Sequence, residues 1–284
     1  MALSPKGRRG YAVGALALAT ALALTACGSQ SSSGAGTTSA GTSASGGAQL
    51  VQPGKLTVCT NIPYEPFQFK DSSGKIVGFD VDMVDLVAKK LGVTQNIVDI
   101  DFAVIKSGAA MAAKKCDLAA AGMTITPERK ANIDFSEPYF DATQALLAKK
   151  GTGAKSLEDV KAKNLKLGAQ ASTTGLEYVK KQGFDPTEYA DSAKELLALQ
   201  AGQADVIVQD LPVVLTWLKK PDVAAKFELI GSLNTGEQYG FGLKKGADPV
   251  LLKTINEEIA KAKQDGTYEK IYVKWFGKKP GELG

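Results

Sequence analysis

The stretch GFDVDMVDLVAKKLG, residues 78–92, decides how the chain is expected to fold. Its apolar residues recur at helical spacing, with acidic residues in the first turns, lysines in the last turn and a glycine, Gly92, that can end the helix. Residues 55–59 read as a buried strand before this helix, and residues 97–102 as a strand after it. The sequence therefore predicts a β-α-β unit, which implies a parallel sheet covered by helices.

The same alternation continues along the rest of the chain. A helix at 104–115 and a strand at 117–121 complete a second unit, and a new series begins with a strand at 144–148. The later predicted elements are strands 165–169, 205–208 and 239–243 and helices 157–163, 172–181, 193–201, 210–219, 249–264 and 268–275. This order predicts an α/β protein with two bodies, which adjacency along the chain would divide near residue 145, and a small ligand is expected in the cleft between them.

The N-terminus reads as a targeting segment. Basic residues precede an apolar run at 11–24, which is too short and too abruptly ended for a spanning helix and predicts a secretory signal over residues 1–26. The ending LTAC resembles the bacterial lipobox, by which Cys27 would become the lipidated first residue; the alternative is an ordinary signal with a chance cysteine. Residues 27–50, rich in Ser, Gly, Thr and Ala, are predicted to be a flexible tether.

Charge and composition exclude several classes of function. Without residues 1–26 the chain carries 31 basic and 30 acidic residues, so nothing indicates a nucleic-acid partner. The chain has no histidine, which removes His-dependent catalytic triads and His-ligated zinc. The three aspartates in residues 78–92 do not share one helical face, and the helix dipole explains them better than a metal site does. No metal and no cofactor are expected.

Two cysteines remain beside Cys27, and their pairing is left open. An oxidising compartment would permit a disulfide between Cys59 and Cys116. The predicted strands argue against it, because Cys59 lies near the end of one strand and Cys116 just before the start of another. If those strands are parallel neighbours, the sulfurs would be too far apart.

The stretch AGMTITPER, residues 121–129, ends a buried strand in polar residues. One explanation is local: Thr126 caps a helix that has Pro127 in its first turn. The other is that the chain holds an anion there, because the planar fork of Arg129 suits a carboxylate and Thr124 can add a hydroxyl donor.

Other polar residues also follow predicted strands. Ser172 and Thr173 lie at a helix start, where backbone N–H groups favour negative charge, and Asp210 can accept from an ammonium group. A cation and an anion held at a fixed separation describe the zwitterionic head of an α-amino acid.

Each candidate also has a purely structural explanation. Asp210 could be a helix cap, Arg129 could pair with Asp134 at the surface, and residues 173–175 could only cap a helix. Tyr64 and Phe102 could be core aromatics. The joint placement of these residues after strands favours a binding site over the separate explanations.

The chain resembles the periplasmic amino-acid-binding proteins of ABC importers, in the polar amino-acid family. The motifs that carry this resemblance are PF (66–67), GFDVDMVDLVAKKLG (78–92), AAAGMTITPERKANIDFSEPYF (119–140), QASTTG (170–175), ADVIVQD (204–210) and GTYEKIYVKWFG (266–277). The resemblance implies the two-lobed periplasmic-binding-protein fold, in which each lobe is a mainly parallel sheet covered by helices. The first lobe would be discontinuous, with residues 51–145 and 241–284, and the second lobe would hold residues 146–240. Two hinge strands would join the lobes, at about 145–149 and 238–241.

The resemblance also implies a role for each site residue. The ligand carboxylate would be held by Arg129, Thr124, Thr173 and Ser172, and the ligand ammonium by Asp210 and the Gly122 carbonyl. The ligand side chain would meet Asn61, Tyr64, Phe102, Gln170 and Gln209. Asn61 stands where members that take cationic or amide side chains often carry aspartate, so a cationic side chain would lack its counter-charge. None of the mapped positions is basic, so an acidic side chain would lack a charged partner too. An uncharged polar amino acid is therefore expected, unless Glu65 turns inward and restores a cationic ligand.

By the same resemblance the protein is a monomeric, non-enzymatic binding protein. It would capture a free amino acid by closing its lobes and deliver it to an ABC permease whose partner hydrolyses ATP. Its lipid anchor at Cys27 would hold it on the outer face of the bacterial cell membrane. The alternatives are a dehydratase of the same fold acting on a cyclic carboxylic acid, with Glu65 or Asp210 as acid or base, and a ligand-sensing subunit.

Overall fold

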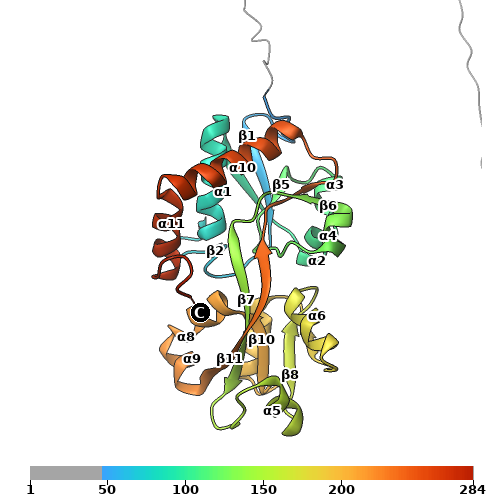
Figure 1. Cartoon of the computed structure of the whole chain (residues 1–284), viewed down its shortest axis with the longest axis vertical. Coiled ribbons are helices and arrows are strands. Elements are labelled where there is room, and N and C mark those ends of the chain that lie inside the picture. Colours follow the sequence, from blue (N-terminus) through green and yellow to red (C-terminus); the bar gives the residue numbers. More distant parts are fainter. Residues whose placement is uncertain (1–46, 284) are drawn as a thin grey trace, which may run out of the picture. The chain divides into compact units, whose positions relative to one another are not determined.

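A computed structural model describes residues 47–283 of the chain (Figure 1). The predicted signal sequence, the lipidation at Cys27 and most of the predicted tether lie outside the described residues. Within the described residues, no helix is long and apolar enough to cross a membrane.

The first five-stranded sheet combines strands from both ends of the chain. Its order is β4-β1-β5-β12-β6, in which β1 runs parallel to β4 and β5, and β12 runs antiparallel to β5 and β6. The strands are β1 (Lys55–Thr60), β4 (Thr94–Asp99), β5 (Leu118–Ala119), β6 (Ile133–Phe135) and β12 (Gly242–Lys244). The C-terminal strand therefore completes the sheet that the N-terminal strands begin.

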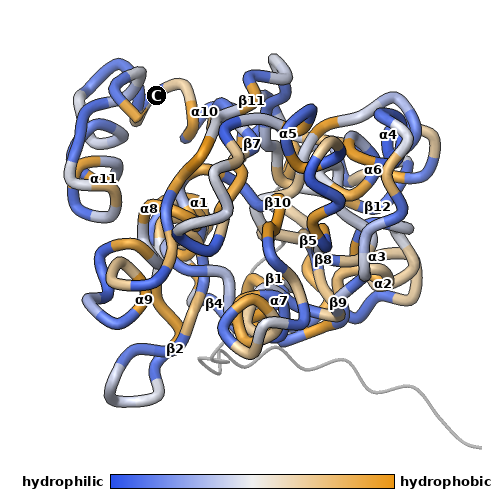
Figure 2. Tube along the Cα trace, turned by 90° about the horizontal axis from the view of Figure 1, so that it is seen from below, coloured by the Kyte–Doolittle hydropathy of each residue, from blue (hydrophilic) through white to orange (hydrophobic). Residues whose placement is uncertain are grey.

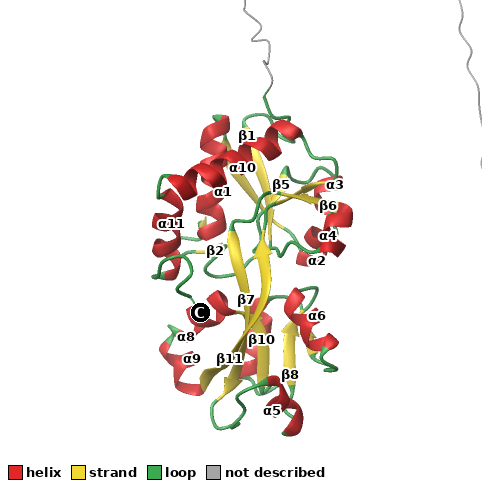
Figure 3. Cartoon of the chain, viewed as in Figure 1, coloured by secondary structure: helices red, strands yellow, loops and turns green. Residues whose placement is uncertain are grey.

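Helices flank this sheet on two sides, as Figures 1 and 3 show. One group is α1 (Phe79–Leu91), α10 (Pro249–Gln264) and α11 (Thr267–Phe276), and the other is α2 (Phe102–Lys106), α3 (Ala109–Ala112) and α4 (Pro127–Asn132). A short hairpin of β2 (Phe69–Lys70) and β3 (Ile76–Val77) precedes α1. The capping expected for α1 is present, because Gly92 adopts a left-handed conformation and its N–H donates to helix carbonyls.

The second five-stranded sheet has the order β11-β7-β10-β8-β9. Its strands are β7 (Phe140–Lys149), β8 (Leu167–Gln170), β9 (Thr187–Tyr189), β10 (Val206–Asp210) and β11 (Phe227–Tyr239). The helices that accompany it are α5 (Leu157–Ala162), α6 (Thr174–Lys181), α7 (Ser192–Gln200), α8 (Leu211–Leu218) and α9 (Pro221–Lys226). Because β7 runs antiparallel to both β10 and β11, this sheet is mixed rather than mainly parallel, as is the first.

The strands β7 and β11 run from one sheet to the other (Figure 1). Residues 145–149, the expected first hinge strand, lie inside the second sheet, where Ala145 to Ala148 pair with β10. The connecting part of β7 is instead its N-terminal end, where Phe140 and Ala142 pair with Tyr239 and Glu237. The hinge prediction therefore placed the first crossing several residues too late. The division into lobes at 145/146 and 240/241 stays a proposal.

Two predicted elements differ from the structure for local reasons. The helix expected at 104–115 is interrupted at Gly108, whose left-handed φ of 80° separates α2 from α3. The strand expected at 97–102 starts at Thr94, because β4 pairs with β1 along its whole length, from Lys55↔Thr94 onward. The Asp101 side chain then caps α2, so that Phe102 begins a helix instead of ending a strand.

An aromatic cluster packs the first group of helices against the start of β7. The ring of Phe67 lies 5.0 Å from that of Phe140 and 5.5 Å from that of Phe276 in α11, and Phe79 lies 5.1 Å from Phe276. These side chains are buried. This aromatic cluster explains why the C-terminal helix packs on the N-terminal part of the chain.

The hydropathy of the chain follows the same division into core and surface. In Figure 2 the apolar stretches of α8 stand out in orange, whereas the turn after β2 is blue and white.

A disulfide joins Cys59 and Cys116, with a Cα–Cα distance of 5.6 Å. The sequence argument against this pairing is wrong. Although β1 and β5 are parallel neighbours, the chain turns and bends between residue 113 and the start of β5, which brings Cys116 beside Cys59. Both cysteines are buried in a cluster with Ile105 and Met111.

Candidate functional site

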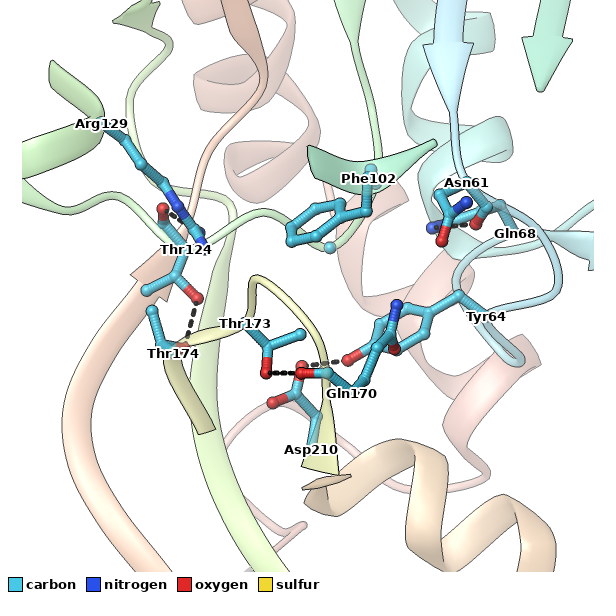
Figure 4. A pocket seen from close by; sticks show the side chains of 12 residues that line it. Asn61, Tyr64, Gln68, Phe102, Thr124, Arg129, Gln170, Thr173, Thr174 and Asp210 are labelled. Atoms are coloured by element: carbon cyan, nitrogen blue, oxygen red, sulfur yellow. Dashed lines mark hydrogen bonds between the residues drawn. The ribbon is translucent and has the colours of Figure 1, made fainter. Parts of the chain in front are cut away.

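One cavity gathers residues from the loops that follow strands of both sheets (Figure 4). The lining residues lie between residues 121 and 129, at the ends of β1, β8 and β10 or in the loops that follow, and at the starts of α2 and α6, and most of these segments were singled out from the sequence. The lining residues are Asn61, Tyr64, Gln68, Phe102, Ala121, Gly122, Thr124, Arg129, Gln170, Thr173, Thr174 and Asp210.

Arg129 brings a buried positive charge to this cavity. Its side chain donates to the carbonyl oxygens of Thr124 (2.9 Å) and Ser172 (3.3 Å), and its guanidinium lies 5.5 Å from the ring centre of Phe102. Burial lowers the pKa of Arg129, because the charged form loses hydration. Among the described residues Arg129 has no carboxylate partner, and Asp134 pairs with Lys245 instead. The surface-pair explanation of Arg129 is therefore wrong.

The helix starts beside Arg129 serve structure and site together. The Thr126 hydroxyl caps α4 by accepting from the N–H of Arg129, and this hydrogen bond fixes the position of the Arg129 backbone. Thr173 caps α6 by accepting from Leu176 N–H, and its hydroxyl donates to the Gln170 carbonyl. Both explanations of the stretch 121–129 are compatible, because the cap fixes the direction in which the arginine leaves the helix.

Thr124 lies opposite the start of α6. Its hydroxyl is 3.2 Å from that of Thr174, so the two loops meet directly. Ser172 does not line the cavity; it adopts a left-handed φ of 68° and contributes its carbonyl to Arg129. The structure thus places Thr124 and Thr173 at the cavity, and Ser172 one layer behind it.

Asp210 brings a buried negative charge to the other side of the cavity. Its carboxylate accepts hydrogen bonds from the hydroxyls of Tyr64 and Tyr239 and from the side-chain amide of Gln144. Burial raises the pKa of Asp210, and these three donors offset part of that rise. Although Asp210 precedes α8, its side chain makes no capping hydrogen bond, so the cap explanation is wrong.

The aromatic and amide residues close the cavity around the two charges. Tyr64 and Phe102 are each 8% exposed, so they are at once core side chains and cavity walls. Asn61 and Gln170 line the cavity as expected, whereas Gln209 lies behind it, with its Oε1 3.0 Å from the Tyr64 hydroxyl. Figure 4 shows Asn61, Gln170 and Phe102 around one space.

Glu65 does not take part in the cavity. Its carboxylate lies 3.2 Å from the ammonium of Lys220 and is partly exposed, and it is not among the lining residues. The condition under which a cationic ligand was expected is therefore not met.

The sequence reasoning missed several residues of the site. Gln68 and Thr174 line the cavity, and Gln144, Tyr239 and Glu195 support it from behind. Thr174 stood in the quoted stretch QASTTG and could have been included. The supporting residues come from strand and helix interiors, where nothing in the local sequence distinguishes a buried polar partner from an exposed one.

Gly122 approaches the ring of Tyr64 so closely that only glycine fits. A Cβ at this position would lie 2.9 Å from a Tyr64 ring carbon, and the residue has a left-handed φ of 54°. Its N–H donates to the carboxyl of Asp80 (2.9 Å), which also accepts from the Tyr139 hydroxyl (2.8 Å). The helix dipole alone does not explain Asp80, because this side chain is fully buried and holds the Gly122 loop in place.

We expect Asp80 to make the stability of the protein depend on pH. Burial raises its pKa from 3.8 to about 7 in the folded protein, so its favourable contribution is complete below about pH 4 and is lost as the pH rises through about 7. Asp80→Asn stays neutral and should gain stability relative to the wild type between pH 4 and 7, by up to about 4 kcal/mol. Urea unfolding of both proteins across this range measures the effect. If the free energy of unfolding depends on pH in the same way in the wild type and in Asp80→Asn, the prediction is contradicted.

No group of three potential metal-binding side chains is placed for a metal ion within residues 47–283. The site offers two opposite charges, hydroxyls and amides around an apolar wall. This chemistry suits the binding of a small zwitterion.

The chain is similar to several known proteins. Residues 56–278 match the family model described as bacterial extracellular solute-binding proteins, family 3. The chain is 34% identical over 273 residues to the "Probable histidine-binding protein" of Neisseria gonorrhoeae, covering 93% of this chain and 94% of that protein. It is 34% identical over 214 residues to the ABC transporter glutamine-binding protein GlnH of Bacillus subtilis (strain 168), covering 74% and 77%.

Solved structures extend the likeness to the fold. The structure of an ancestral arginine-binding protein bound to glutamine aligns with a TM-score of 0.73 and 41% identity, covering 80% of this chain and all of that one. The predicted periplasmic-binding-protein fold is thereby confirmed, with mixed sheets in place of mainly parallel ones.

Proposed function

The chain belongs to the bacterial extracellular solute-binding proteins, family 3, and from this premise we propose that it captures one free amino acid in the described cavity and delivers it to an ABC permease. It is an amino-acid-binding component of an ABC transporter, not an enzyme. We further propose that the ligand has an uncharged polar side chain.

A single observation carries the proposal. Arg129 and Asp210 carry opposite charges, both are buried, both line one cavity, and neither has a charged partner among the described residues. A buried charge without a partner is costly, and a ligand that carries a carboxylate and an ammonium group would supply both partners at once.

The remaining site residues fit the same ligand head. Thr124 and the N–H groups at the start of α6, after Thr173, would join Arg129 at the ligand carboxylate. Gly122, held by Asp80, would offer its carbonyl to the ammonium beside Asp210. Ser172 would act by fixing Arg129 and not by direct contact.

Contacts across the cavity support capture by closure. Tyr64 reaches Asp210, Thr124 reaches Thr174, and the Ser192 hydroxyl donates to the Pro63 carbonyl (2.6 Å). Because these contacts join parts of the chain that belong to different sheets, an open form that lacks them would admit the ligand and a closed form would retain it.

The proposal includes the membrane. A lipid at Cys27 and a tether to residue 50 would hold the binding protein, as a monomer, on the outer face of the cell membrane, beside its permease. One acyl chain binds only marginally, so stable anchoring requires the several chains of a lipoprotein.

Calorimetry with blocked ligands tests the assignment of the cavity. At least one free amino acid with an uncharged polar side chain should bind, whereas the same amino acid with an amidated carboxyl group or an acetylated amino group should bind at least about 100-fold more weakly, because one buried charge would lose its partner. Equal affinity for free and blocked forms would refute the proposal. Cyclic carboxylic acids are the control for the dehydratase alternative and should not bind.

A further inference from the structure

The cavity wall away from the two charges consists of neutral amides. Arg129 and Asp210 are the only charged lining residues in the described part of the chain, and the proposed function assigns both to the ligand head. The remaining polar groups beside the aromatic rings include the side chains of Asn61, Gln68 and Gln170. A side-chain amide can present either its oxygen or its nitrogen, so its neighbours decide which group faces the ligand.

Backbone carbonyls set the direction of two of these amides. The Asn61 Nδ2 donates to the Ile100 carbonyl (3.2 Å), and a carbonyl can only accept, so the Asn61 Oδ1 is left for the cavity. Held in this direction, Asn61 offers the ligand the same kind of group, an acceptor, that an aspartate at this position would offer. The Gln68 Nε2 donates to the Asn61 carbonyl (3.3 Å), and the Gln68 Oε1 is buried without a hydrogen-bond partner. This end of the cavity therefore offers two acceptors.

A backbone N–H sets the direction of the third amide through a relay. The Asp210 N–H can only donate, and it donates to the Gln209 Oε1 (2.8 Å), which turns the Gln209 Nε2 away. That nitrogen donates to the Glu195 Oε2 (2.7 Å) and, at the long limit of 3.5 Å, to the Gln170 Oε1. The Gln170 Nε2 remains as a donor toward the cavity, opposite Asn61 in Figure 4.

We propose that the amino acid bound in this cavity carries a terminal carboxamide, as glutamine and asparagine do. Its carbonyl would accept from the Gln170 Nε2, and its NH2 group would donate to the Asn61 Oδ1 and the Gln68 Oε1. A guanidinium or ammonium group offers only donors, a carboxylate only acceptors, and an aliphatic side chain neither. This inference rests on the proposed function, because it assumes that the two charges hold the ligand head.

Glu195 acts in this arrangement as a positioning residue. It is fully buried in α7, and one of its oxygens accepts from Gln209. Its other oxygen has no partner, and burial holds the pKa of this carboxyl well above its usual value, which favours the neutral form. We therefore assign Glu195 the task of an acceptor that orients Gln209, not that of a counter-charge for a cationic ligand.

Calorimetry on the wild-type protein tests the ligand class without any substitution. Glutamine or asparagine should bind at least about 100-fold more tightly than methionine, glutamate or arginine, because each mismatch leaves buried amide groups unpaired. Methionine is the matched control, since it has a similar length and no amide. Arginine or methionine binding as tightly as the amides would overturn the inference and leave the proposed function standing, whereas binding of no free amino acid would overturn both.

Two substitutions at Glu195 distinguish a hydrogen-bond acceptor for Gln209 from a counter-charge for the ligand. Glu195→Gln keeps an acceptor for Gln209, so the glutamine affinity should stay within about threefold of the wild type. Glu195→Met removes the acceptor and should lower the preference for glutamine over methionine by about tenfold. Loss of binding in Glu195→Gln would identify a counter-charge and overturn the assignment. If Glu195→Met does not fold, the amino-acid series on the wild-type protein still tests the ligand class, and Glu195→Gln still distinguishes an acceptor from a counter-charge.

Discussion

Replacing Arg129 with alanine should lower the affinity for the amino-acid ligand by about two to four decades. The substitution leaves a buried ligand carboxylate without its cationic partner, which costs about 2–5 kcal/mol. Arg129→Lys should fall between the alanine variant and the wild type, because lysine keeps the charge and loses the two parallel donors of the guanidinium fork. Isothermal titration calorimetry measures both losses.

The stability of the ligand-free protein distinguishes this effect from misfolding. Arg129 has no charged partner among the described residues, and burial lowers its pKa, so its removal should leave the unfolding temperature without ligand nearly unchanged. Lys130→Ala, an exposed neighbour in α4, is the matched control and should bind normally. Near-wild-type affinity in the Arg129→Ala variant would refute the role of this residue.

Asp210→Asn should produce a loss of similar size through the ligand ammonium group. The neutral amide can still accept from Tyr64, Tyr239 or Gln144, so the pocket should keep its shape while it loses its charge. We expect about 2–5 kcal/mol, or roughly two to four decades in affinity. Calorimetry with the preferred amino acid measures this loss.

A ligand that lacks the ammonium group isolates the interaction. The carboxylic acid that lacks only the amino group (the des-amino acid) should bind the wild type weakly. Its affinity should fall little further in the Asp210→Asn variant, because the pair of Asp210 and the ligand ammonium is already absent. Asp222→Asn, an exposed acid in α9, should behave as the wild type with both ligands. If the des-amino acid and the amino acid suffer equally from Asp210→Asn, Asp210 does not hold the ammonium group.

Periodicity and capping residues predicted most elements of the fold. The helix at residues 78–92 was expected from its spacing, its terminal charges and Gly92, and α1 spans Phe79–Leu91. The boundaries failed where pairing with a distant strand determined them, as at β4, or where one glycine interrupted a helical pattern, as at Gly108. The return of β12 to the first sheet followed from the resemblance, because adjacency along the chain carries no information about it.

The site residues divide in the same way. Arg129, Thr124 and Asp210 could be singled out because each follows a strand and has a side chain suited to one end of an amino acid. Glu195 and Tyr239 could not, since they lie inside an amphipathic helix and a strand, where a polar residue ordinarily faces solvent. Whether an amide presents its oxygen or its nitrogen depends on backbone groups distant in sequence, which only coordinates reveal.

The register of β7 with β11 is interrupted between Leu233 and Glu237. The two strands thus lack regular pairing between Leu233 and Glu237, and we expect bending there to break few backbone hydrogen bonds. We expect each five-stranded sheet to move as a rigid body when this segment bends. The free energy of opening would then depend mainly on the few side-chain contacts across the cavity. These contacts would therefore set the residence time of the bound ligand.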